Sequence, residues 1–105
     1  MDISSIKALC RCGAVQYTNH FMVRILRRGI DIIDVEEAIL NGRIIKEYPE
    51  DHPYPSCLIL GSDRDNQPAH IVCGVCEDML WLITAYRPDS NEWEKDWETR
   101  RRETL

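Results

Sequence analysis

The chain has 105 residues, of which 44% are hydrophobic and 30% are charged, as expected for one small globular domain. Its formal net charge of −5 argues against tight nonspecific binding to nucleic acid, and no apolar run approaches the roughly 20 residues that span a bilayer. The N-terminus lacks a basic segment followed by an apolar stretch, and the number of cysteines, five, is odd. We therefore expect a cytoplasmic protein with free thiols and no membrane contact.

The chain is expected to begin with a partly helical extension, residues 1–17. Residues 3–9 have the pattern of a short helix, with Ser4 or Ser5 as the N-cap and Gly13 as the stop. The extension precedes the segment in which helical periodicity is clearest.

Two longer helices are predicted next. The first begins at an N-cap formed by Thr18 or Asn19 and ends at Gly29, and its apolar residues recur at helical spacing. The second begins at Asp34, whose spacing from a later glutamate resembles a capping box, and it ends at residues 41–42.

The hydrophobic period then changes to that of strands. Four strands are predicted, separated by a proline-rich loop and two turns, at residues 43–48, 56–61, 68–76 and 79–86. Short connections enforce antiparallel pairing. The sequence therefore predicts an α+β domain over residues 18–89, in which the N-terminal helices cover one face of a four-stranded antiparallel sheet.

The C-terminal segment, residues 90–105, is expected to be a charged and partly helical tail. Acidic residues precede the basic residues 100–102, an order that complements a helix dipole. Trp93 and Trp97 are four residues apart, so a helix would place them on one face, where they would dock on the domain or on a partner.

Several segments, taken in order, resemble one known family. They include a histidine followed by arginine and by Arg-Gly-Ile in residues 20–30, the second helix in residues 35–42, and the last two strands around residues 70–72 and 83–88. This ordered set resembles the domain-of-unknown-function family 4258 over about residues 18–97.

The resemblance implies a fold and a role. The family is similar to the RelE/BrnT-like toxin ribonucleases of bacteria, in which helices pack on an antiparallel sheet. Its members are often encoded beside a small zinc-finger antitoxin of the YgiT type. The resemblance thus implies a RelE-like fold, a toxin of a toxin–antitoxin system and an antitoxin partner.

A first catalytic candidate lies on the helix that ends at Gly29. His20, Arg24, Arg27 and Arg28 fall at i, i+4, i+7 and i+8 and share one stripe. Cleavage of RNA without metal needs an acid, a base and a cation for the phosphorane charge. We assign acid–base chemistry to His20, charge stabilisation to Arg24, and substrate binding to Arg27 and Arg28. The alternative is a solvated polar stripe.

A second candidate is the pair His70 and Tyr86, which lie at the start of the third predicted strand and at the end of the fourth. A two-residue turn at residues 77–78 would pair His70 with Ala85, whereas a three-residue turn would pair it with Tyr86. The alternative is a structural histidine beside a packed tyrosine. Nearby candidates for substrate binding are Thr84 and Arg87.

A third candidate is a metal site, because Cys73 and Cys76 have C-x-x-C spacing and Cys10 and Cys12 could add thiolates. Within a strand, however, positions 73 and 76 point to opposite faces. We therefore assign no metal ligand and expect no cofactor. Cys57 and Cys73 are expected to be buried apolar side chains.

The sequence and the resemblance together favour a metal-independent endoribonuclease that cleaves RNA by attack of the 2′-hydroxyl. The alternative is a noncatalytic module that binds a small zinc-finger antitoxin-like protein, which the acidic second half and the two tail tryptophans favour. A small metal-binding protein is the third hypothesis.

Overall fold

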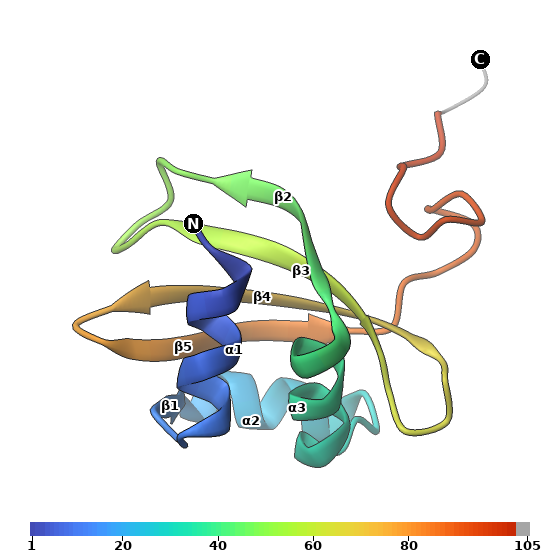
Figure 1. Cartoon of the computed structure of the whole chain (residues 1–105). Helices are drawn as coiled ribbons and strands as arrows, with labels where there is room; N and C mark the ends of the chain where they lie inside the picture. The colour runs from blue at the N-terminus through green and yellow to red at the C-terminus, as the bar shows by residue number, and fades with distance from the viewer. Residues whose placement is uncertain (103–105) are drawn as a thin grey trace.

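A computed structural model describes residues 1–102 of the chain (Figure 1). The elements of this part are, in order, α1 Ile3–Arg11, β1 Val15–Tyr17, α2 Asn19–Arg27, α3 Ile32–Asn41, β2 Arg43–Tyr48, β3 Ser56–Ser62, β4 Pro68–Cys76 and β5 Met79–Tyr86. None of the helices in residues 1–102 has the length and apolar character needed to cross a membrane.

The sheet has five strands in the order β1-β5-β4-β3-β2, and it is mixed. Strands β2 to β5 form the predicted antiparallel meander, whereas β1 pairs parallel to β5, with Val15 opposite Leu80 and Tyr17 opposite Leu82. The α+β class is therefore confirmed, but the expectation of a four-stranded antiparallel sheet was wrong. A strand of only three residues is too short to show the alternation by which strands are recognised.

The N-cap of α2 is the predicted one, whereas the N-caps of α1 and α3 differ from those predicted. The Thr18 hydroxyl accepts from the Phe21 amide, as predicted. Asp2 caps α1, and Asp31 caps α3 by accepting from the Ile33 amide at 2.8 Å. Helix α3 thus begins earlier than predicted, and Asp34 lies in its first turn.

All three helices cover one face of the sheet (Figure 1). Their apolar stripes meet the inward-pointing side chains of β3, β4 and β5 in a single core, which includes Ile6, Phe21, Ile39, Ile71 and Leu82. The centre of this helix-covered face is therefore filled by apolar side chains.

On the other face, the outer face, aligned strands bring side chains into rows across the sheet. One row comprises Leu60, His70 and Tyr86, and the next comprises Lys46, Leu58, Val72 and Thr84. No helix within residues 1–102 covers this face. Tyr54 of the loop between β2 and β3 packs on Trp81 at one end of it, and the C-terminal tail packs at the other end.

The tail that follows β5 is not helical, contrary to the expectation for residues 90–105, of which 103–105 lie outside the described part. It forms turns closed by an isolated bridge between Trp93 and Arg100. The Asp96 carboxylate accepts from the backbone amides of Glu98 and Thr99 at 2.9 Å, and such local bonds compete with a helix. The tail packs on the outer face where β4 begins and β5 ends.

Candidate functional site

The register between β4 and β5 places His70 directly opposite Tyr86. The turn at residues 77–78 has two residues, both with positive φ, which alone would pair His70 with Ala85. A β-bulge follows, because Val72 pairs with Thr84 and Cys73 with Leu82, so that Ile83 is extra. The bulge shifts the register by one residue and puts His70 and Tyr86 on the same face.

Both ring nitrogens of His70 are hydrogen-bonded, and their partners define its tautomer. Nε2 lies 2.7 Å from the Trp97 carbonyl oxygen, which can only accept, so Nε2 carries the proton. Nδ1 lies 3.1 Å from the Tyr86 hydroxyl and therefore accepts from it. Burial lowers the pKa of His70, and the bond to the Trp97 carbonyl opposes this shift only in part.

Trp93 closes the pocket around His70. Its ring stands edge-on to the imidazole with the ring centres 4.5 Å apart, and only 6% of its surface is exposed. His70 itself has no exposed surface. A large substrate could reach Tyr86, but His70 could act on it only through the Tyr86 hydroxyl.

Tyr86 is half-buried and lies in the electrostatic field of two guanidinium groups. Burial and the neighbouring Tyr48 raise the pKa of Tyr86, while the positive charges of Arg100 and Arg28 oppose the rise. The phenol therefore stays protonated at neutral pH, consistent with its donation to His70.

Arg28 reaches the outer face from α2 by passing the end of β1. Its Nη1 donates to Thr84 Oγ1 at 3.0 Å and to the Ala85 carbonyl oxygen at 2.9 Å, on the edge of β5 that β1 is too short to cover. Thr84 and Tyr86 are two residues apart on one face. Four of the predicted site residues, Arg28, His70, Thr84 and Tyr86, are thus brought together.

A cleft of about 340 Å³ opens between the outer face and the tail. Its lining residues are Ile45, Lys46, Tyr48, Leu58, Tyr86, Trp93, Glu98 and Arg100. The Lys46 ammonium lies 5.5 Å from the centre of the Tyr48 ring, and the Arg100 guanidinium lies 5.1 Å from that of Trp93. Cations and aromatic rings of this kind are suited to phosphates and bases.

Sequence reasoning missed several groups of the cleft and of the His70 pocket beside it. Lys46 and Tyr48 could have been predicted to share one face of the sheet, since they are two residues apart at the end of a predicted strand. For Arg100 and the Trp97 carbonyl no such prediction was possible, because their placement depends on the path of a tail without periodic structure.

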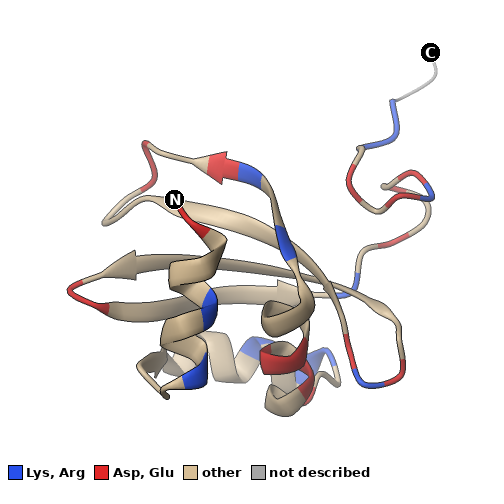
Figure 2. Ribbon diagram, viewed as in Figure 1, with Lys and Arg blue, Asp and Glu red and all other residues tan. Residues whose placement is uncertain are grey.

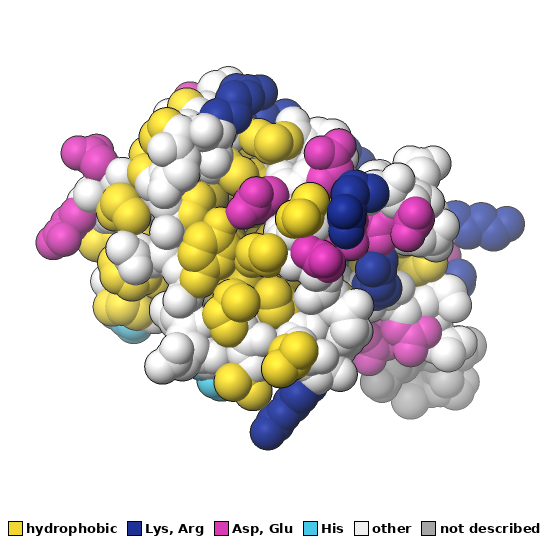
Figure 3. Space-filling view, turned by 90° about the horizontal axis from the view of Figure 1, so that it is seen from below, with side chains coloured by type: hydrophobic (Ala, Val, Ile, Leu, Met, Phe, Trp, Pro, Cys, Tyr) yellow, Lys and Arg dark blue, Asp and Glu magenta, His cyan; other side chains and the backbone are white. Residues whose placement is uncertain are grey.

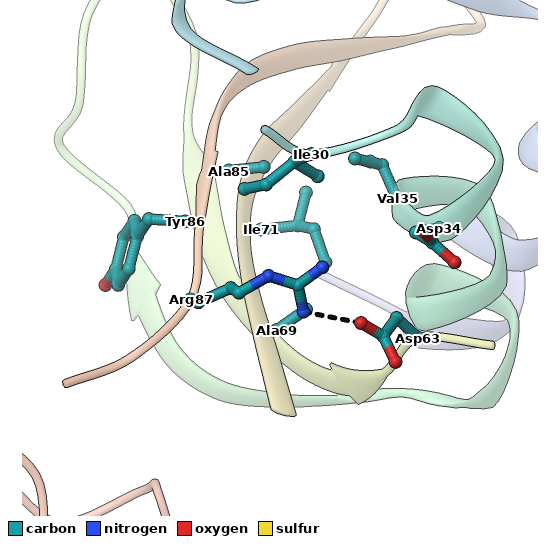
Figure 4. Close-up of a pocket in the computed structure, with 9 residues that line it drawn as sticks. All are labelled: Ile30, Asp34, Val35, Asp63, Ala69, Ile71, Ala85, Tyr86 and Arg87. Carbon is teal, nitrogen blue, oxygen red and sulfur yellow. Dashed lines mark hydrogen bonds and ion pairs between the residues drawn. The ribbon is translucent and has the colours of Figure 1, made fainter. Parts of the chain in front are cut away.

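Arg87 lies on the helix-covered side, away from Tyr86 (Figure 4). Its Nη1 donates to Oδ2 of Asp63, whose side chain is 2% exposed. The hollow beside this ion pair measures only about 10 Å³, room for about one water molecule. Arg87 therefore belongs to a structural ion pair here, and we do not include it in the site.

His20, Arg24 and Arg27 are also on the helix-covered side. Helix α2 packs into the core through Phe21 and Ile25, whereas His70 points to the outer face. His20 therefore belongs to a helix that packs on one face of the sheet, whereas His70 makes its hydrogen bonds on the other face. Both ring nitrogens of His70 are bonded to Tyr86 and Trp97, and neither is bonded to a residue of α2.

The cysteines that sequence analysis expected in the core are there. Cys57 and Cys73 pair across β3 and β4, both fully buried, with their sulfur atoms 4.0 Å apart. Residues 1–102 contain no group of three or more histidine, cysteine or acidic side chains arranged to hold a metal ion.

Comparison with known proteins identifies a family for most of this fold. Residues 17–87 match the family model described as Domain of unknown function (DUF4258). No curated protein and no solved structure matches the chain significantly. The matched range includes α2, α3 and β2 to β5 but neither α1 nor the tail. Because it spans well over half of the chain, the protein belongs to the DUF4258 family.

Proposed function

We propose that this protein is a metal-independent endoribonuclease with a RelE-like fold, acting as the toxin of a toxin–antitoxin system. The observation that carries the proposal is the Tyr86 hydroxyl, bonded to a buried neutral His70 and within the field of Arg28 and Arg100. The family resemblance to toxin ribonucleases supports it. The acidic net charge fits a local substrate site better than general nucleic-acid binding.

The proposed reaction begins at the 2′-hydroxyl of RNA. Its oxygen attacks the adjacent phosphorus while its proton passes to the Tyr86 oxygen, and the phenol proton moves to Nδ1 of His70. The Trp97 carbonyl, which accepts from Nε2, stabilises the imidazolium that forms. Tyr86 is thus the catalytic residue, and His70 acts through it.

The remaining charges are assigned to residues that border Tyr86. Arg28 and Arg100 stabilise the negative charge of the phosphorane. Lys46, in the same cleft, gives a proton to the leaving 5′-oxygen. The bond from phosphorus to the 5′-oxygen breaks, and the products carry a 2′,3′-cyclic phosphate and a 5′-hydroxyl.

Cleavage of a structured RNA and of mixed mRNA, with chelator present, tests this mechanism. We expect the wild-type protein to cleave and Tyr86→Phe to lose about 10²- to 10⁴-fold in rate, because only the hydroxyl is removed. Tyr54→Phe is the matched control, since Tyr54 packs on Trp81 away from the cleft. A folded wild-type protein without activity, or an active Tyr86→Phe, would contradict the proposal.

The stripe on α2 is the competing location for the same activity. His20→Ala and Arg24→Ala should retain cleavage if the reaction occurs at Tyr86, because both residues belong to α2, which packs on the helix-covered face through Phe21 and Ile25. Loss of cleavage in these variants, together with an active Tyr86→Phe, would move the reaction to α2.

Binding of an antitoxin without catalysis is the second candidate function. Strand β2 is an edge strand, so its unpaired side can accept an extended segment of another protein. Its bulge near Ile45 and its charged side chains Arg43 and Lys46 discourage unspecific pairing. The mass of the protein mixed with the product of the adjacent gene tests this role. If the two proteins do not form a complex, the role is wrong.

A further inference from the structure

Helices α2 and α3 expose apolar side chains that the core does not use. Leu26 is 80% exposed and Ile33 is 52% exposed, and Met22 and Val23 lie beside Leu26 on α2. Figure 3 shows hydrophobic side chains gathered on this side of the molecule. A contiguous exposed apolar surface of this kind is typical of a protein–protein contact.

A groove of about 270 Å³ runs through this surface. It is lined by Met22, Val23, Ile25, Leu26, Ile30 and Ile32. Both the α2 ridge and the start of α3 contribute to it, so a side chain from outside can insert between the two helices. We call these residues together with Ile33 the α2–α3 surface.

The two helices of this surface carry opposite charges (Figure 2). Helix α2 contains Arg24 and Arg27 and no acidic residue. Helix α3 contains Asp34, Glu36 and Glu37 and no basic residue. Asp34 is paired with Arg64, and Glu36 accepts from the Tyr17 hydroxyl, so the charge of α3 offered to a second copy is mainly that of Glu37. The apolar groove is therefore formed between a basic helix and an acidic helix.

We propose that the α2–α3 surface binds a second copy of this chain. In a two-fold dimer the same surface is used by both copies, and each contact occurs twice. If α2 packed on α2, like charges would face one another. If α2 of one copy packs on α3 of the other, arginines face glutamates, and Leu26 and Met22 bury their surface against Ile33 of the second copy.

The dimer predicts a concentration-dependent mass for the full-length chain. Sedimentation velocity from about 1 to 500 µM should show conversion from monomer to dimer by mass action. Leu26→Lys should be a folded monomer throughout, because it places a charge in the apolar contact at a position that is exposed in the monomer. Ser90→Lys, which adds the same charge in the exposed tail, should dimerise like the wild type.

Charge reversal tests the pairing of α2 with α3. Arg27→Glu and Glu37→Arg should each weaken dimerisation by about tenfold or more, and the double variant should recover most of the loss. Circular dichroism establishes that each variant is folded. A double variant no better than the single variants would overturn the pairing.

Two other outcomes would overturn the dimer itself. One is a wild-type chain that stays monomeric at every concentration, which would leave the α2–α3 surface to a partner of different sequence. The other is a dimer that Leu26→Lys does not weaken, which would place the contact elsewhere.

Discussion

His70 illustrates how a single residue couples the fold to pH. Burial lowers its pKa below the ordinary value of 6.5. At pH values between the lowered pKa of the folded chain and 6.5, the unfolded chain binds more protons than the folded chain. The free energy of unfolding therefore rises with pH in this range, and it falls as the pH drops below about 6.5. This pH dependence of the unfolding free energy arises because the imidazole of His70 is kept neutral where it is buried against Trp93.

Replacing His70 by glutamine should flatten this pH dependence. We expect the unfolding free energy of the wild type, measured in urea from about pH 5 to pH 8, to decrease more steeply toward acid than that of His70→Gln. His20→Gln, at an exposed position, is the control and should behave like the wild type. Equal slopes in wild type and His70→Gln would show that His70 is not held neutral by burial.

For single residues, the sequence was enough to propose the His70–Tyr86 pair. It was not enough to predict the strand register that puts both side chains on one face. Alternation put both residues near one end of a hairpin, and the outcome depended on one residue of register. The deciding residue is Ile83, extra in the bulge, and nothing about an isoleucine in a β-rich run marks it as unpaired.

At the scale of elements, long periodic segments were predictable and short or aperiodic ones were not. Helix α2 and strands β4 and β5 have the predicted bounds to within a residue or two, because their patterns repeat several times. Strand β1 has three residues and takes its place from pairing with β5, a contact between distant parts of the chain. The tail has helical charge order, but Asp96 diverts its backbone into a turn.

The packing of α3 on β3 depends on Gly61. An ideal Cβ at this position would overlap the backbone of Ala38 in α3, and backbone cannot swing aside as a flexible side chain can. Gly61→Ala should therefore lower the unfolding free energy by about 3 kcal/mol or more, measured by urea denaturation.

Gly13→Ala separates this clash from the general effect of replacing glycine. Gly13 has a φ of 78°, and no atom lies within 4 Å of the place that a Cβ would occupy. The substitution should therefore cost only about 1 kcal/mol, from backbone conformation alone. Similar losses in the two variants would mean that α3 can move away from β3 without penalty.

At the scale of the whole molecule, the two faces of the sheet are covered by different means. The helix-covered face is closed mostly by α2 and α3, which belong to the family match, and by α1, which does not. The outer face is closed in part by the tail, which also lies outside the match. The candidate site therefore combines residues inside the range matched by the family model with tail residues outside that range.

The tail is held on the outer face by a few contacts of unequal strength. An exposed ion pair joins Arg43 to Glu98, and exposed pairs contribute little. The buried ring of Trp93 on His70 stabilises the docked tail more, because burial of an aromatic side chain removes much apolar surface from water. Accessibility of His70 should thus depend chiefly on Trp93.

Trp93→Ala should release the tail and expose His70 while leaving the sheet folded. Truncating a buried tryptophan costs about 3 kcal/mol, which corresponds to about a hundredfold rise in the fraction of molecules with the tail undocked. Diethyl pyrocarbonate modifies accessible neutral imidazoles, so mass spectrometry should find His70 modified correspondingly faster, with the exposed His20 and His52 as internal references. Lys95→Ala, at an exposed tail position, should leave the rate unchanged. If His70 reacts equally slowly in Trp93→Ala, the strands themselves protect it, and access to Tyr86 and the cleft would not depend on how the tail is docked.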